Sequence, residues 1–69
     1  MKNSLKVQRA IKNITQAELA DLIQVSRQTI NTIESGKYVP STVLALKMAK
    51  IFEKPVEEIF ELEEMDFNS

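Results

Sequence analysis

Five polar residues between positions 27 and 32 have the chemistry to recognise the edges of nucleic-acid bases. Arg27 can donate two parallel hydrogen bonds to guanine, and Gln28 can both donate to and accept from adenine. Thr29 and Thr32 each offer a hydroxyl to a base or a methyl group to thymine, and Asn31 adds a second carboxamide. The segment therefore predicts a base-reading surface, provided that one helix holds these side chains outward.

The spacing of Ile30 and Ile33 predicts the direction in which that helix faces. Residues three apart lie on one face of an α-helix, so two isoleucines turned toward a core leave the polar residues outside. An ordinary solvated face is the alternative, but such faces are more often built from glutamate and lysine. The composition of the outer face therefore favours recognition of DNA in the major groove, which admits one helix.

Local capping signals predict the helices that precede this segment. Thr15 and Glu18 have the spacing of a capping box, which predicts a second helix from Gln16. Ser26 is a favourable N-cap for the third helix, so only about two residues separate these helices. Apolar spacing predicts a first helix over about residues 4–13, with an inward face of Leu5, Val7, Ala10, Ile11 and Ile14.

The second half of the chain predicts two more helices. Gly36 is the only glycine and is well placed as a left-handed stop after the third helix. Ser41 caps a fourth helix that runs to about Glu53, and Pro55 suits the first turn of a short fifth helix through Phe60. We therefore expect an all-α fold, a compact five-helix arrangement that occupies residues 1–69 as a single domain.

Charge is divided unevenly along the chain, although the net charge is only −1. Residues 1–50 hold eight basic and three acidic groups, which gives +5, whereas residues 51–69 hold one basic and seven acidic groups, which gives −6. Such polarity lets one pole face phosphates while the other turns away. A solvated acidic tail is the alternative.

Composition argues against an enzyme. The sequence has no cysteine and no histidine, which removes the thiol nucleophile, the commonest general base and a frequent metal ligand. Paired acids such as Glu57 with Glu58, or Glu63 with Glu64, leave a small hydrolase as a rival, but adjacent helical residues do not face each other. Apolar stretches are far shorter than the roughly 20 residues of a membrane helix, and no signal segment opens the chain. We expect a cytoplasmic protein that is not an enzyme, without cofactor, metal or membrane contact.

Two stretches of the sequence resemble the short Cro/repressor-like (XRE-type) helix-turn-helix regulators. The pattern TQAELADLIQVSRQTINTIESGKYVPS follows that family nearly throughout, and STVLALKMAKIFEKPVEEIF is similar to the helices that come after it. The resemblance covers about residues 4–60. It includes Gln16, the small Ala20 at the contact between the helices, Val25 in the turn, and Ile30 and Ile33 in the core.

The resemblance implies two kinds of contact with double-stranded DNA. Base contacts are expected on the outer face of the third helix, at Arg27, Gln28 and Thr32, with Thr29 and Asn31 beside them. Contacts with the sugar-phosphate backbone are expected at the ends of the motif, at Gln16, Ser26, Lys37 and Tyr38. Backbone contacts set the register, and base contacts select the sequence.

At two positions, Gln24 and Glu34, comparison with the family pattern predicts a structural feature rather than a DNA contact. Gln24 stands where the family usually has glycine in a left-handed turn, which implies a strain of the order of 1 kcal/mol. Glu34 would repel phosphate unless it is neutralised, and the family's partner for it corresponds to Arg9. We therefore expect a structural ion pair between Arg9 and Glu34, with a free, solvated Glu34 as the alternative.

An apolar series near the C-terminus predicts a homodimer. Domains of this size usually read DNA through two-fold symmetry, with recognition helices about 34 Å apart, and the short relatives dimerise through this end. The series lies in a dimerisation segment of about residues 55–67 and consists of Val56, Ile59, Phe60, Leu62, Met65 and Phe67. The alternation at residues 61–63 hints at a short strand that pairs across the symmetry axis, and a frayed tail is the alternative.

The residues and the resemblance together predict a sequence-specific DNA-binding regulator with the helix-turn-helix at about residues 16–34. We expect a repressor that binds a palindromic operator as a homodimer. The rival interpretation is an antitoxin or an adaptor that uses the same fold to hold a protein partner, because the C-terminal apolar series would serve that purpose as well.

Overall fold

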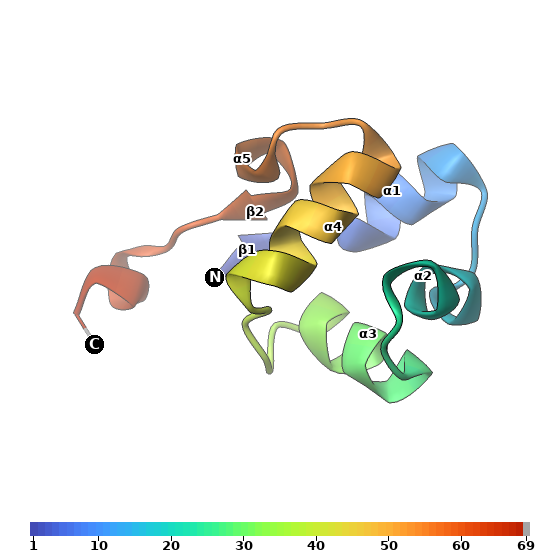
Figure 1. Cartoon of the computed structure of the whole chain (residues 1–69). Helices are drawn as coiled ribbons and strands as arrows, with labels where there is room; N and C mark the ends of the chain where they lie inside the picture. The colour runs from blue at the N-terminus through green and yellow to red at the C-terminus, as the bar shows by residue number, and fades with distance from the viewer. Residues whose placement is uncertain (69) are drawn as a thin grey trace.

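A computed structural model describes residues 1–68, which form five short α-helices and a two-stranded sheet. The helices are α1 (Leu5–Lys12), α2 (Gln16–Ile23), α3 (Arg27–Glu34), α4 (Thr42–Phe52) and α5 (Val56–Ile59). The strands are β1 (Lys2–Asn3) and β2 (Phe60–Glu61), and a 3-10 helix, η1 (Glu64–Phe67), follows β2. In Figure 1, α2 and α3 lie side by side with a tight turn between them. This mostly helical fold is the one that the sequence predicts.

Side-chain caps begin the three central helices at the predicted residues. The Thr15 hydroxyl accepts from the backbone N–H of Glu18 at 3.0 Å, and the Glu18 carboxylate accepts from the N–H of Thr15 at 2.9 Å. Ser26 and Ser41 accept in the same way from the N–H groups three residues further on. Each cap satisfies an amide that would otherwise lack a partner at a helix start, so local chemistry fixes where α2, α3 and α4 begin.

Left-handed backbone conformations follow four of the helices, at Asn13, Gln24, Gly36 and Glu53. The sequence predicts two of these, and Gln24 has φ 62° and Gly36 φ 81° as expected. After α2, the N–H groups of Gln24 and Val25 donate back to the carbonyl groups of Asp21 and Ala20, which ends the helix and turns the chain sharply. That turn sets the angle between α2 and α3.

We expect Gln24→Gly to raise the free energy of unfolding by about 1 kcal/mol, because glycine adopts this conformation without a Cβ penalty. The exposed Gln24 side chain makes no hydrogen bond that the substitution would remove. Urea denaturation measures the change. Gln28→Gly is the matched control, since the same replacement within the right-handed α3 should lower stability by about 0.5–1 kcal/mol. A loss of stability in Gln24→Gly would contradict the strain assigned to this turn.

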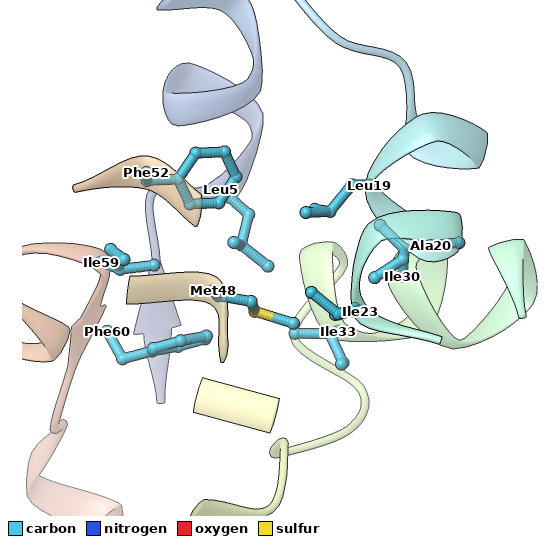
Figure 2. Packing of buried hydrophobic residues seen from close by; sticks show 10 residues of the cluster. All are labelled: Leu5, Leu19, Ala20, Ile23, Ile30, Ile33, Met48, Phe52, Ile59 and Phe60. Atoms are coloured by element: carbon cyan, nitrogen blue, oxygen red, sulfur yellow. The ribbon is translucent and has the colours of Figure 1, made fainter. Parts of the chain in front are cut away.

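A single apolar cluster holds the helices together, as Figure 2 shows. Ile30 and Ile33 of α3 are fully buried and meet Leu19 and Ile23 of α2, with Met48 of α4 beside them. The other members are Leu5, Ala20, Phe52, Ile59 and Phe60. Burial of both isoleucines fixes the rotation of α3 about its axis and therefore turns its polar residues outward.

The prediction of which α1 residues face the core is wrong in part. Leu5 is fully buried, but Val7 and Ile11 are 57% and 66% exposed, and Ala10 is exposed as well. Each helical residue turns about 100° from the last, so residues two and six positions after Leu5 cannot share its face. Gln8 lies on the buried side instead, and its amide donates to the Ser4 hydroxyl at 3.4 Å.

The C-terminal strand exists, but it pairs within the chain. β2 lies antiparallel to β1, with Asn3 opposite Phe60 and Lys2 opposite Glu61. The sequence offered no signal for β1, because Lys2 and Asn3 have no strand pattern of their own. The sequence predicts a strand at residues 61–63 that pairs with a second subunit across a symmetry axis. The strand instead covers residues 60–61 and pairs with β1 of the same chain. The alternative expectation, a frayed tail, is also wrong, because residues 64–67 after β2 form η1.

The predicted dimer series divides between the core and the surface. Ile59 and Phe60 are only 1% and 7% exposed, so the chain's own core uses them and they are not free to hold a second subunit. Val56 is half-buried and packs against the same core. The β1–β2 pairing holds Phe60 opposite Asn3, next to the buried Ile59. Leu62, Met65 and Phe67 remain exposed.

Candidate nucleic-acid interface

The outer face of α3 carries the predicted base-contacting residues. Arg27, Gln28 and Asn31 are exposed, whereas Thr29 and Thr32 are half-buried at the edges of that face. The Thr32 hydroxyl donates to the Gln28 carbonyl at 2.7 Å and receives the Gln28 amide at 3.3 Å. Thr29 is bonded to the Ser26 hydroxyl at 2.9 Å. These hydrogen bonds orient the two threonine side chains, and Arg27, Gln28 and Asn31 are the exposed residues of the face.

Gln16 joins the start of α2 to the outer face of α3. Its amide nitrogen donates to Glu34 Oε1 at 3.2 Å and to Asn31 Oδ1 at 3.5 Å. The second bond uses the Asn31 oxygen as acceptor and does not involve its amide nitrogen, which is a hydrogen-bond donor. Gln16, Arg27, Gln28 and Asn31 surround a hollow of about 280 Å³. Residues predicted for base contacts and for backbone contacts thus meet around one depression.

A larger hollow of about 610 Å³ lies next to the first and shares Gln16 and Arg27 with it. Lys6 and Arg9 of α1 also line it, and none of its lining residues is acidic. Because Arg9 is paired with Glu34, the cations of this hollow that can attract phosphate are Lys6 and Arg27. Sequence reasoning did not place Lys6 in the site. The sequence does contain a signal that could have identified Lys6: it lies three residues before Arg9 and therefore on the same side of α1.

Arg9 and Glu34 form an ion pair that joins α1 to α3. Arg9 Nη2 donates to Glu34 Oε1 at 3.0 Å, its Nε donates to Oε2, and its Nη1 reaches the Ile14 carbonyl at 3.1 Å. The two side chains are only 15% and 9% exposed. The free, solvated Glu34 considered as an alternative is therefore not what the structure contains.

The environment of Glu34 keeps it ionised. Burial acts to raise the pKa of its carboxyl, but hydrogen bonds from Arg9 and Gln16, with the nearby charges of Arg9 and Lys6, outweigh burial and lower the pKa. The Arg9 guanidinium is correspondingly held charged, since its hydrogen bonds to Glu34 raise its pKa. The acid nearest to the outer face of α3 is thus neutralised by a partner rather than left to repel an anion.

The remaining predicted contacts lie at the two ends of α3, with Ser26 at its N-terminal end and Lys37 and Tyr38 beyond its C-terminal end. The Ser26 hydroxyl caps α3 by accepting from the Thr29 N–H. Lys37 and Tyr38 are exposed in the loop after Gly36. The N–H groups of Gly36 and Lys37 donate to the carbonyl groups of Ile33 and Thr32, which closes α3 and fixes the start of this loop. Lys37 and Tyr38 line neither of the two hollows.

The acidic pairs considered for a hydrolase lie outside the face of α3 and the two hollows. Glu57 and Glu58 are adjacent residues of α5, and Glu63 is bonded to the N-terminal ammonium of Met1 at 2.9 Å. Among residues 1–68, no three carboxylates gather where they could hold a metal ion. Within the same residues, no helix has the length and apolar content needed to cross a membrane.

Comparison with known proteins places this geometry in context. Residues 5–59 match a family model described as helix-turn-helix, HTH_3. An uncharacterized HTH-type transcriptional regulator of Methanocaldococcus jannaschii is 57% identical over 60 residues, which cover 87% of this chain and 91% of the relative. The uncharacterized HTH-type transcriptional regulator YgzD of Bacillus subtilis is 47% identical over 64 residues, which cover 93% and 97%. An uncharacterized HTH-type regulator of Archaeoglobus fulgidus is 45% identical over 64 residues, covering 93% and 90%.

Proposed function

This chain belongs to the XRE-type helix-turn-helix family of DNA-binding transcriptional regulators, and we propose that it binds a palindromic operator as a homodimer and represses transcription. The observation that carries the proposal is the exposed polar face of α3, framed by Gln16 and by a basic hollow. Its action is recognition without chemistry in the cytoplasm, and the whole chain acts as one binding domain.

Base selection is assigned to the outer face of α3. Arg27 fits a bidentate contact with guanine, and Gln28 fits adenine. Asn31 offers a donor to a base because Gln16 occupies its oxygen. The threonines lie beside them, and since the Thr32 proton is engaged with the Gln28 carbonyl, the methyl group of Thr32 is what it offers to thymine.

Phosphate contacts are assigned to both sides of that face. Lys37 and Tyr38 lie beyond the C-terminal end of α3, while Gln16 and Lys6 line hollows on the side of α1 and α2. The first free amides of α2 and α3 add donors, and Ser26 contributes through the cap that orients them. Contacts on two sides of the recognition helix fix its register in the groove.

Repression follows from occupancy. A protein seated on an operator that overlaps a promoter excludes the polymerase from the same DNA, and this effect requires DNA binding alone. A reporter gene placed behind the selected operator tests the direction of control: expression should fall when the chain is supplied and should recover when Arg27→Ala is supplied instead. A rise in expression would show activation.

Lys37→Ala should weaken binding to all DNA sequences alike. The lysine contributes one phosphate contact per subunit and no base contact, so the magnitude of the slope of log K against log salt should fall by about 1 per subunit, or about 2 for the dimer. Fluorescence anisotropy titrations at several salt concentrations, with the operator and with an unrelated duplex, measure this slope. Lys54→Ala, in the acidic part of the chain, is the control and should leave it unchanged. A loss restricted to the operator would assign Lys37 to base recognition instead.

A protein partner is the second candidate function, as in an antitoxin or an adaptor. The observation in its favour is the exposure of Leu62, Met65 and Phe67. Purification of the chain from its native host separates the two possibilities. A partner protein that remains bound at high salt, together with no salt-dependent shift of DNA, would favour the partner function over the regulator.

A further inference from the structure

A chain of polar side chains leads from the Arg9–Glu34 ion pair to the outer face of α3. Glu34 Oε1 accepts from the amide nitrogen of Gln16 at 3.2 Å, and the same nitrogen donates to Asn31 Oδ1 at 3.5 Å. The Glu34 side chain is only 9% exposed and Gln16 is half-buried, whereas Asn31 is exposed. The chain of hydrogen bonds therefore begins at a buried charge and ends on the surface that carries the predicted base contacts.

The charge of Glu34 fixes the direction of every hydrogen bond in this chain. Its carboxyl is ionised because its partners outweigh burial and lower its pKa, and an ionised carboxylate only accepts. Gln16 has to turn its NH2 group toward Glu34, since its carbonyl oxygen would otherwise face a second acceptor. The same NH2 group faces Asn31, which therefore offers its oxygen. The other branch of the Asn31 amide, its NH2 group, is a donor.

These two acceptors use the whole donor capacity of the Gln16 side chain. A carboxamide nitrogen has two hydrogens, and Glu34 and Asn31 take one each. Gln16 is also the first residue of α2, and the backbone N–H groups of a first helical turn have no partner within the helix. A phosphate contact of Gln16 therefore belongs to its backbone N–H, while its side chain acts on α3.

An asparagine that only donates distinguishes bases by their exocyclic group. In the major groove, guanine O6 and thymine O4 accept hydrogen bonds, whereas adenine N6 and cytosine N4 donate them. Purine N7 accepts in adenine and guanine alike, so the exocyclic group makes the difference. An asparagine that turns without restraint reads adenine by using its oxygen and its nitrogen together. Asn31 lacks the oxygen for that contact, because Gln16 holds it.

We propose that Gln16 is a positioning residue that makes Asn31 select a keto base, guanine or thymine, over adenine or cytosine. The inference rests on the proposed DNA binding and names the class of base that is read at one position of each half-site. Asn31 touches the base, and Gln16 acts through Asn31. The Arg9–Glu34 pair thereby has a second role, because its charge sets the direction of the hydrogen bonds that end at Asn31.

Exchange of a donor for an acceptor at Asn31 tests the proposal. Asn31→Ala first identifies the base pair concerned, as the one whose preference disappears. Asn31→Asp keeps the size of the side chain and still accepts from Gln16, but it turns an oxygen toward the base. The preference at that base pair should therefore change from a keto base to an amino base, with ratios of dissociation constants of about 2- to 12-fold per half-site.

Titrations against duplexes with every base pair at each position of the selected operator measure these ratios. Asn13→Asp is the matched control, because it introduces the same charge at an exposed residue of the basic hollow. Repulsion of phosphate should weaken the binding of this control to all duplexes alike and leave each base preference as it is. A change of preference in Asn31→Asp alone therefore reports on the base contact and not on the added charge.

Gln16→Ala separates positioning from a merely structural role. Without Gln16, Asn31 turns either end toward the base, so the preference for keto bases should fall and adenine should be accepted. Adding Gln16→Ala to Asn31→Ala should change no base preference further. A carboxyl NMR titration of the chain without DNA gives a second measurement. The pKa of Glu34 should be higher in Gln16→Ala than in the unchanged chain, since a donor to the carboxylate is lost.

Several results would overturn the inference. These are an amino base preferred by the unchanged chain at that position, no base pair that responds to Asn31→Ala, an unaltered preference in Asn31→Asp, an equal loss on all duplexes in Gln16→Ala, or a Glu34 pKa that does not rise. Each leaves the proposed function standing if Arg27→Ala still alters the preference at its own base pair. A chain that prefers no duplex over another defeats the proposed function, and the inference with it.

Discussion

Arg9→Ala is expected to lower the free energy of unfolding by roughly 2–4 kcal/mol, because it leaves the Glu34 carboxylate buried without its counter-charge. Arg9 also donates to the Ile14 carbonyl, so the variant loses the contact that joins α1 and the start of α2 to the end of α3. Urea denaturation followed by circular dichroism measures the change.

Lys12→Ala is the matched control. Lys12 also pairs with a glutamate, Glu53, at 2.9 Å, but their side chains are 37% and 78% exposed. Because solvent screens an exposed pair, the pair contributes little to stability, and this variant should stay close to the unchanged chain. Adding Glu34→Gln to Arg9→Ala should recover part of the lost stability, since it removes the unpaired charge. Equal losses in Arg9→Ala and Lys12→Ala would contradict the structural role of the Arg9–Glu34 pair.

The same pair predicts a dependence of stability on pH. The pKa of Glu34 is lower in the folded chain than its ordinary value, so ionised Glu34 stabilises the fold above about pH 4.5. This contribution is lost as the pH falls below that ordinary value and through the lowered pKa of the folded state. The difference in stability between the unchanged chain and Arg9→Ala should therefore narrow on acidification. A difference that stays constant from neutral pH to pH 3 would show that charge at Glu34 is not its source.

Arg27→Ala is expected to weaken binding to the preferred operator by about 1–3 kcal/mol for each half-site, which is about 5- to 150-fold per half-site. A bidentate contact discriminates one base pair, so the loss should vanish on an operator in which that base pair is already changed. Anisotropy titrations of both proteins against duplexes with single base-pair changes measure this difference.

The control for that experiment is Lys37→Ala, which should weaken binding to every duplex in the panel by a similar factor. The two variants thus separate base recognition from phosphate contact on the same set of DNA molecules. A loss in Arg27→Ala that is uniform across the panel would contradict the assignment of Arg27 to a base. It would instead make Arg27 a second phosphate contact beside the basic hollow that it lines.

The sequence predicted the parts of the fold that local chemistry determines. Caps at Thr15, Ser26 and Ser41 depend on residues three positions away, and the left-handed turn at Gln24 depends on the helices on either side of it. The outward rotation of α3 required only Ile30 and Ile33. These signals lie within a few residues of one another, so a single sequence contains them in full.

What the sequence did not predict depends on contacts between distant segments. The strand β1 exists because β2 lies beside it, some 58 residues later in the chain. Asn3 further ties β1 to α3 by donating to the Ile33 carbonyl at 2.9 Å. The same pairing explains why Ile59 and Phe60 were misassigned to a dimer surface, since it brings them into the core. The hydrogen bond from Gln16 to Asn31 likewise required the crossing of α2 and α3.

Selection of bound fragments from a pool of random duplexes at low ionic strength tests the central claim most directly. Two copies of α3 that touch bases on one face of the DNA should enrich an inverted repeat whose half-sites are centred about 10–10.5 base pairs apart. A selected pool whose sequences stay as random as the starting pool would contradict the claim, because the outer face of α3 would then read no bases.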